Sequence, residues 1–482
     1  MKRRIAPLLA KLSRAESSHE FLHTAPEIDL LLTRQRKKGG MSMVKNIAAG
    51  LLAAYIGIVH AQAPAQPAIP NPPTPTVTTP VSVASAVTAA DASKIDAVAA
   101  TQTFMNRLQG EARAKSDAYA EGGYWLLLWN FLYGLVVAWL LLSMRISSRI
   151  RDFAERRSRR KIPQTLIYAL VYVPLTAVLT LPITFYEGFF REHQYGLSNL
   201  SFLSWLGEAG ISVGVEMVIA GIAIAGLYTI LRRFPQTWWA WGAVAGAAFI
   251  MLLIMAGPLF ISPLFNTYKP LPPGPIRDDI LSLARANGIP VDNVYYSDAS
   301  KQTKRVSANV SGLFGTTRIT LNDNLLNRTS PAEIRAVMAH EMGHYVLNHG
   351  LKHTVSFALV LLGGLLFIKF SWDWTAARFG DRFGVRSISD TAGFPLLAAL
   401  FSVYIFVATP VVKTIIRTAE VEADLFGLNA AREPDGFAEA IFKLGEYRKL
   451  EPGTAEEFIF FDHPSGYNRI FAAMRWKAEN LK

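Results

Sequence analysis

The amino-acid sequence predicts a mostly α-helical protein that crosses a membrane six or seven times. Hydrophobic residues make up 51% of its 482 positions and charged residues only 18%, which points to a membrane protein. Six apolar runs are each near the length that a helix needs to span a bilayer, the fifth being slightly short. They cover residues 124–144, 166–185, 211–231, 238–265, 355–370 and 392–416. One such run could be a buried core helix, but six in one chain indicate a multi-pass membrane region.

Three segments are predicted ahead of the first run. Residues 1–42 are basic, and form either a cytoplasmic tail or sequence upstream of the true start. Residues 43–61 have a basic beginning, an apolar middle and small residues at the end, as in a secretory signal peptide or an uncleaved anchor. Residues 62–121 combine a Pro/Ala/Thr-rich linker, which cannot form a packed core, with an alanine-rich surface helix.

The net charge of +12 follows the membrane pattern rather than indicating a nucleic-acid partner. Eight lysines and arginines fall between Arg145 and Lys161, directly after a spanning run, where the positive-inside rule expects a cytoplasmic loop. An RNA-binding surface would need interleaved aromatic residues or a recognisable module, and neither occurs. The chain has no cysteine, so any zinc site must use histidine and carboxylate ligands.

An HExxH motif at residues 340–344 is typical of a zinc-hydrolase site on a helix. His340 and His344 are four apart, so they lie on one helical face and can share a metal ion. Glu341 lies close enough to hold a water molecule and act as its base. A capping box that begins at Ser330 predicts where the helix starts. The alternative is a solvated helix that carries two ordinary histidines.

A third ligand must come from another part of the chain, because two histidines leave zinc short of ligands. Glu420 and Asp424, just after the last apolar run, are four apart and share a helical face. Glu420 can supply the third ligand, and Asp424 can accept the N–H of a zinc-binding histidine. An acidic, solvated helix end would be the alternative if the HExxH motif were absent.

The C-terminal segment contains His463, followed by Pro464, which restricts the local backbone. Such a histidine could donate to the oxyanion of a tetrahedral intermediate, with Arg469 orienting either the histidine or an acidic partner. Taken alone, the fragment would indicate only a surface histidine.

Together these motifs resemble the CAAX prenyl protease 1 (Ste24-type) family of membrane zinc metallopeptidases. The residues that carry the resemblance are His340-Glu341-x-x-His344, Glu420-x-x-x-Asp424, His463-Pro464-Ser465-x-x-x-Arg469 and the upstream segment Arg191-Glu192-His193-Gln194-Tyr195-Gly196-Leu197-Ser198. The similarity covers roughly residues 120 to 475.

The resemblance implies one zinc ion per chain, held by His340, His344 and Glu420, with Glu341 as general base. It implies that Asp424 supports a zinc ligand, and that His463 stabilises the transition state with help from Arg469. The family fold is an α-helical membrane barrel around a chamber, capped by a gluzincin-like α+β catalytic part.

The segment 306–312 resembles the family's substrate-binding edge strand, to which a peptide adds by backbone pairing. Ala308, Asn309 and Gly312 are the positions expected to contact substrate. The sequence departs from the family here, because the family usually has an Asn-Ala pair five and four residues before the glycine, whereas Ser307 and Ala308 stand at these positions.

Two further histidines, His349 and His353, follow the motif. On a continuous helix they would point to roughly the opposite face from His340, so we expect them at the water boundary before the next span and not at the metal.

The arrangement of the spans predicts that the catalytic part lies in the periplasm of a bacterium. If the basic end of segment 43–61 stays in the cytoplasm, the run 124–144 leads inward and the arginine-rich loop is cytoplasmic. The run 238–265 then leads outward, and the arginines before the last run are again cytoplasmic. Eukaryotic relatives place their site on the cytosolic side, so the resemblance points the other way.

We therefore expect a multi-pass, monomeric zinc metalloendopeptidase of the bacterial inner membrane that cleaves membrane-associated or misfolded polypeptides. The expected regions are a four-span membrane region at 122–267, a catalytic region at 268–352, a two-span region at 353–418 and a C-terminal part at 419–482. An intramembrane-cleaving protease is disfavoured, because Glu333, Arg335 and Asn348 flank the motif. A non-catalytic receptor or transporter that retains the zinc site is the remaining alternative.

Overall fold

The computed structural model describes residues 95–312 and 317–481, all of which belong to one compact unit. The predicted tail at 1–42, the signal segment at 43–61 and the proline-rich part of the linker lie outside the described residues. The alanine-rich part of the linker begins to be described at α5 (Ala97–Met105), a short surface helix.

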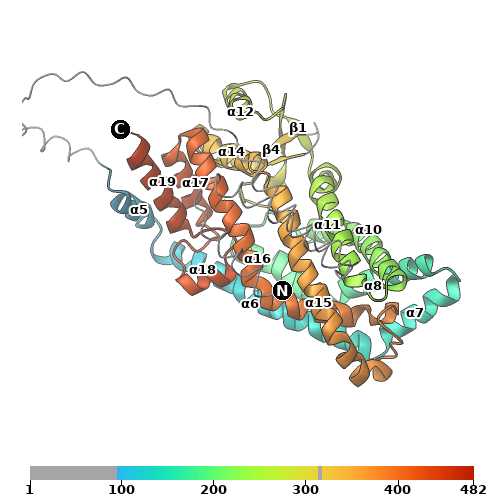
Figure 1. Cartoon of the computed structure of the whole chain (residues 1–482). Coiled ribbons are helices and arrows are strands. Elements are labelled where there is room, and N and C mark those ends of the chain that lie inside the picture. Colours follow the sequence, from blue (N-terminus) through green and yellow to red (C-terminus); the bar gives the residue numbers. More distant parts are fainter. Residues whose placement is uncertain (1–94, 313–316, 482) are drawn as a thin grey trace, which may run out of the picture. The chain divides into compact units, whose positions relative to one another are not determined.

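Within the described residues, six helices are long and apolar enough to cross a membrane, which confirms the predicted multi-pass region (Figure 1). They are α6 (Gly110–Ser143), α8 (Lys161–Phe185), α10 (Phe202–Arg233), α11 (Trp238–Ala256), α15 (His349–Phe383) and α16 (Phe394–Ala431). α8 and α11 each continue into a π-helical turn, at Tyr186–Arg191 and Gly257–Ile261.

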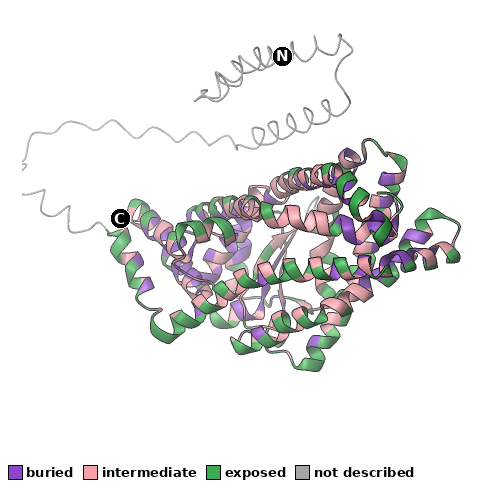
Figure 2. Cartoon of the chain, turned by 90° about the horizontal axis from the view of Figure 1, so that it is seen from below, coloured by how far each residue is buried: buried purple, intermediate pink, exposed green. Residues whose placement is uncertain are grey.

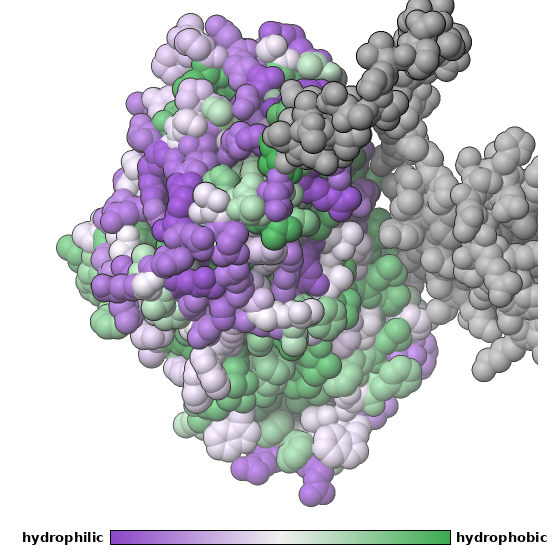
Figure 3. Space-filling model, turned by 90° about the vertical axis from the view of Figure 1, so that its left-hand side faces the viewer, coloured by the Kyte–Doolittle hydropathy of each residue, from purple (hydrophilic) through white to green (hydrophobic). Residues whose placement is uncertain are grey.

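The outer surface of these helices is apolar. Leu203, Phe370 and Val407 are 77%, 75% and 74% exposed, as expected for side chains that contact lipid. Exposed and intermediate residues predominate along the long helices (Figure 2). On one face, hydrophobic residues gather in the lower part and hydrophilic residues cover the upper part (Figure 3). This division matches a protein with one part in the bilayer and another in water.

The arginine-rich segment forms α7 (Ile146–Arg157), which packs against the loop before α16. Arg151 and Asp390 form a buried ion pair at 2.5 Å, and Arg386 pairs with Glu155 at 3.0 Å. The two basic segments that the sequence predicts to be cytoplasmic therefore lie together, at the end of the helices opposite to α14 and β4 (Figure 1).

A small mixed sheet follows the fourth span. Its strand order is β1-β2-β4-β3, with β1 (Tyr268–Pro270), β2 (Val294–Ser297), β3 (Ala308–Ser311) and β4 (Arg318–Asn322). β2 and β4 are parallel, and the other two pairs are antiparallel. β3 has one hydrogen-bonded neighbour, so it is an edge strand, as predicted for segment 306–312.

Helices cover the sheet and form a separate apolar core. α12 (Pro275–Ala286), α13 (Asp323–Arg328) and α14 (Pro331–Val346) pack with it around fully buried Ile319, Leu321 and Met338. The C-terminal helices α17 (Pro434–Leu444), α18 (Thr454–Phe460) and α19 (Gly466–Asn480) complete this part, and α5 packs on α19. The predicted combination of membrane helices with an α+β part is confirmed.

One helix boundary differs from the expected regions. α16 runs without interruption from the bilayer to Ala431, so the expected boundary at 418/419 falls inside one helix. The residues that follow the apolar run, Thr418 to Asp424, include no proline or glycine that would end it. One rigid element therefore both spans the membrane and carries Glu420.

Candidate metal centre

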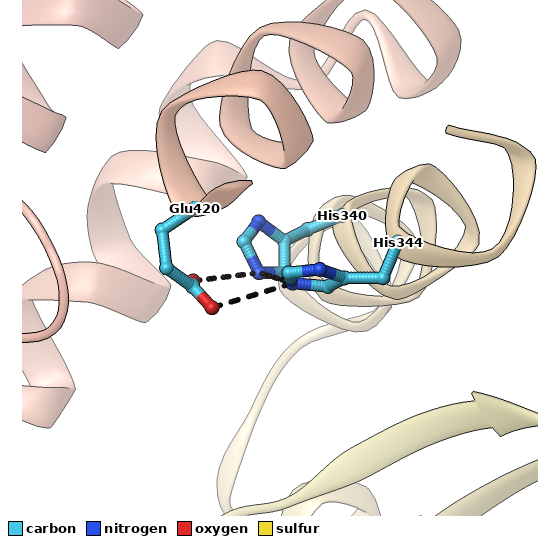
Figure 4. A group of neighbouring side chains, drawn as sticks. All are labelled: His340, His344 and Glu420. Carbon is cyan, nitrogen blue, oxygen red and sulfur yellow. Dashed lines mark hydrogen bonds and ion pairs between the residues drawn. The ribbon is translucent and has the colours of Figure 1, made fainter. Parts of the chain in front are cut away.

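Three side chains from two helices converge on one point (Figure 4). His340 and His344 lie one turn apart on α14, and their Nε2 atoms are 3.2 Å apart. Glu420, from α16, places Oε2 3.3 Å from His340 Nε2 and Oε1 3.4 Å from His344 Nε2. The structure thus brings together the three ligands predicted from the sequence.

The helix that carries the histidines starts where the sequence predicts. Ser330 caps α14 by accepting the Glu333 N–H, while the Glu333 side chain accepts the Ser330 N–H. These reciprocal bonds satisfy backbone N–H groups that a helix start leaves free. Pro331 occupies the first turn, where it has no hydrogen bond to lose.

Glycines allow α16 to approach α14 closely enough for Glu420 to reach the histidines. A Cβ atom at Gly427 would lie 3.0 Å from the backbone nitrogen of His340, and one at Gly343 would lie 3.2 Å from Cα of Ala423. Both separations are tighter than ordinary contacts. A larger residue at either position would push the two helices, and hence the ligands, apart.

The three residues fit a zinc ion. Two imidazole nitrogens and a carboxylate are the ligands of many catalytic zinc sites, and three protein ligands leave a position open. Glu420 Oε2 is buried and accepts no hydrogen bond from the described residues, although His340 Nε2 and His463 Nε2 lie 3.3 and 3.1 Å away. A buried anionic oxygen that faces nitrogen lone pairs is costly unless a cation lies between them.

Asp424 and Arg469 support His340 from behind. Asp424 Oδ1 lies 2.8 Å from His340 Nδ1, and Arg469 donates to both carboxylate oxygens, at 2.8 and 2.6 Å. A proton on His340 Nδ1 leaves the Nε2 lone pair free for a metal ion. All three side chains are buried. Arg469 therefore contacts the predicted acidic partner and forms no hydrogen bond with His463.

His463 faces the same centre from the loop before α19. Its Nε2 lies 3.1 Å from Glu420 Oε2, and its Nδ1 lies 2.7 Å from Asp462 Oδ1. Lys413 in turn donates to the other Asp462 oxygen at 2.9 Å. Asp462 was missed from the sequence, although its position directly before His463 was the available signal.

Burial shifts the titration of the site. It raises the pKa of Glu341 to about 7, and it lowers the pKa of His344 to about 3 together with the neighbouring charge of His340. Burial opposes charge on His340 as well, but the nearby carboxylates of Asp424 and Glu420 outweigh it and raise that pKa to about 9. The carboxylates of Asp424 and Glu420 therefore favour positive charge at His340.

His349 is not among the converging ligands, as expected, but the place expected for it at the water boundary is wrong. The backbone of Asn348 is left-handed, with φ of 55°, so α14 ends and α15 starts in a new direction. His349 is buried, with Nδ1 2.8 Å from His344 Nδ1 and Nε2 3.0 Å from Glu422 Oε2. A helix continued through Asn348 would have pointed this ring away.

The expected substrate positions lie on or next to β3. Ala308 and Asn309 pair with Leu321 and Thr320 of β4 on one side, and α14 packs on the strand. Gly312 follows the strand with φ of 109°, a conformation that side chains rarely adopt. The other edge of β3 has no strand partner among the described residues, so its backbone groups can pair with a peptide.

Comparison with known proteins agrees with this geometry. Residues 94–267 match the family model of the CAAX prenyl protease N-terminal region with five membrane helices, and residues 270–477 match peptidase family M48. The chain is 29% identical to an uncharacterized metalloprotease, YhfN, of Bacillus subtilis, over 71% of this chain and 82% of that protein.

Two yeast proteins extend the comparison. CAAX prenyl protease 1 of Saccharomyces cerevisiae is 29% identical over 55% of this chain and 62% of its own length. The crystal structure of S. mikatae Ste24p superposes with a TM-score of 0.64 at 23% identity, over 78% of this chain and 94% of that one. At that identity the superposition shows a shared fold.

Proposed function

Because the chain belongs to the Ste24-type branch of peptidase family M48 and is a membrane zinc metallopeptidase, we propose that it cleaves membrane-associated or misfolded polypeptides inside their chains. The observation that carries the proposal is the convergence of His340, His344 and Glu420 next to Glu341, on and against a helix that packs on the edge strand β3. The relatives' name suggests prenylated substrates, but no described feature favours a prenyl group over other apolar chains.

We assign the catalytic roles from the geometry. Zinc, when bound, polarises the scissile carbonyl and makes water more acidic. Glu341, one residue after His340, takes a proton from the attacking water and delivers it to the leaving amine. His463 needs protons on both nitrogens, one donated to Asp462 and the other to the carbonyl oxygen as it gains charge. Burial lowers the pKa of His463, and the hydrogen bond with Asp462 opposes this shift by favouring the protonated form.

Asp424 and Arg469 position His340, and we propose an equivalent chain for His344. If His344 binds metal through Nε2, its Nδ1 carries a proton and donates it to His349 Nδ1. The proton of His349 then lies on Nε2 and is donated to Glu422. Each zinc-binding histidine is in this way oriented by a carboxylate, one directly and the other through a second imidazole.

The replacement His349→Ala is expected to weaken zinc binding by about 10- to 100-fold, since it leaves the His344 N–H without its acceptor. His353→Ala is the matched control, because His353 lies one turn further along α15 and its Nε2 has no hydrogen-bond partner among the described residues. Competition with a coloured chelator measures both affinities. Equal affinities in the two variants would show that His349 has no role in holding the ligand.

Metal removal tests the function itself. Treatment with 1,10-phenanthroline should abolish cleavage of unfolded casein in detergent, and one equivalent of zinc per chain should restore it, because the ligand set offers one metal position. The 1,7-isomer, which does not chelate, controls for nonspecific inhibition. Persistent cleavage by metal-free protein would refute a metallopeptidase mechanism.

We propose that the protein acts as a monomer in the inner membrane with its catalytic part in the periplasm. The two basic segments lie at one end of the spanning helices and pair with each other through Arg386 and Glu155. The positive-inside rule assigns such an end to the cytoplasm, and α14 lies at the opposite end. Labelling of single cysteines introduced at exposed Arg157 and Arg475, with a membrane-impermeant maleimide in intact spheroplasts, distinguishes the two orientations.

A further inference from the structure

A cavity of about 290 Å³ opens beside His463. Aromatic rings form much of its wall. The charged side chains that line it are Arg305, Arg448, Lys449, Asp462 and Arg469. His463, the residue proposed to stabilise the transition state, forms part of its wall.

Four of these five charges are neutralised by partners outside the wall. Arg305 pairs with Glu192, Lys449 with Glu121 and Glu456, Arg469 with Asp424, and Asp462 with Lys413. Their orientation is thereby fixed, and together they contribute little net charge to the cavity.

Arg448 is different. Its guanidinium forms no hydrogen bond or ion pair with any residue in the described part of the chain. Arg448 is partly buried, and this burial together with the neighbouring charge of Arg469 lowers its pKa, although the more distant carboxylates of Asp462 and Glu420 oppose the shift. Leaving such a group unpaired is costly, and residues of this kind are typical of sites that receive an anion.

The backbone around Arg448 is held in place independently of its side chain. Its carbonyl accepts a hydrogen bond from Ser116 Oγ at 3.4 Å. Leu450, two residues later, is buried, and its carbonyl accepts the Tyr467 N–H at 2.9 Å. The guanidinium is therefore presented by a fixed loop rather than by a free end.

We propose that this cavity binds a carboxylate of the polypeptide substrate through Arg448. The inference rests on the proposed function, and it names a feature of the substrate. Arg305, on the cavity wall, lies three residues before β3. A peptide that adds antiparallel to β3, the commoner mode of pairing, directs its C-terminal side toward the start of β3 and hence toward the cavity. The carboxylate therefore lies on the C-terminal side of the scissile bond.

Two kinds of carboxylate share this chemistry, the substrate's own C-terminus and an Asp or Glu side chain. Cleavage sites are first mapped in casein with zinc-loaded wild-type protein, so a failure of the proposed function would be seen at that stage as absence of cleavage. One mapped site is then synthesised as three quenched fluorescent peptides without other acidic residues. The first has a free C-terminus, the second is amidated, and the third is amidated with one glutamate after the cleaved bond.

The wild type should cleave the first or the third peptide with a kcat/KM about tenfold or more above that of the second. Arg448→Gln should remove the preference, and Arg448→Lys should keep part of it, since a charge remains without the planar fork. Arg113→Gln is the matched control, because Arg113 is paired with Glu451 and lies outside the cavity wall. It should behave as wild type.

The pattern of rates decides both the site and its ligand. A fast first peptide identifies the C-terminal carboxylate, and a fast third peptide identifies an acidic side chain. Equal rates for all three peptides in the wild type would overturn the proposal, as would a preference that survives in Arg448→Gln. Thermal unfolding of each variant shows whether it is folded. If Arg448→Gln does not fold, the partial loss of preference expected for Arg448→Lys still tests the proposal.

Discussion

Replacing Glu341 with glutamine is expected to lower kcat for peptide hydrolysis by about 10²- to 10⁴-fold, the usual contribution of a general base. Glutamine has nearly the same shape and can still hold water, but it cannot accept a proton. Because Glu341 is not among the three converging ligands, the variant should still bind one zinc ion per chain. Metal analysis and casein cleavage on the same purified sample measure both quantities.

Glu333→Gln is a useful comparison for this experiment. Glu333 lies on the same helix and is buried, but it caps the start of α14 and pairs with Lys443 at 2.7 Å. Its loss should reduce stability while leaving kcat of the folded protein near that of wild type. Hydrolysis retained by zinc-loaded Glu341→Gln protein would contradict the role of base.

The same variant offers a way to find substrates. A protein that binds polypeptides but cannot cleave them should retain its substrates, and peptides recovered with it can be compared with those bound to wild type. Enrichment of chains with an acidic group or a C-terminus a few residues beyond the bound segment would agree with the proposed role of Arg448.

The parts of the site that could be predicted from sequence are those governed by local rules. His340 and His344 follow from helical spacing, and the capping box at Ser330 fixes where their helix begins. Glu420 and Asp424 could be paired for the same reason, because they share one face of an uninterrupted helix. The six spans follow from hydropathy alone.

The parts that were missed depend on a change of direction or on distant contacts. His349 was expected on the wrong face, because helical spacing was continued through Asn348; asparagine can adopt a left-handed conformation that ends a helix, but the spacing alone does not show that it does so here. The absence of an ion-pair partner for Arg448 could not be predicted from the sequence either. Four of the charges around it are paired through residues far away in sequence, and only the folded chain shows which cation has no partner.

Arg469→Met is expected to lower the free energy of unfolding by about 3–5 kcal/mol, because it leaves Asp424 as a buried carboxylate without its main partner. Both side chains are only 6% exposed, and the two hydrogen bonds between them are 2.8 and 2.6 Å long. Asp424 also orients His340, so zinc affinity should fall together with stability. Denaturant unfolding in detergent and chelator competition measure the two effects.

A second replacement separates support of Asp424 from a direct role of Arg469 in catalysis. The double variant Asp424→Asn, Arg469→Met removes the uncompensated charge, so it should recover much of the lost stability while zinc affinity stays low. Arg475→Met is the matched control on the same helix, since that arginine is 65% exposed and water screens its ion pair with Glu479. If Arg469→Met instead kept normal stability and zinc affinity but lost kcat, Arg469 would act on the substrate and not through Asp424. Through the ion pair between Asp424 of α16 and Arg469 of α19, the membrane helix and the C-terminal helix therefore jointly fix the orientation of the zinc ligand His340.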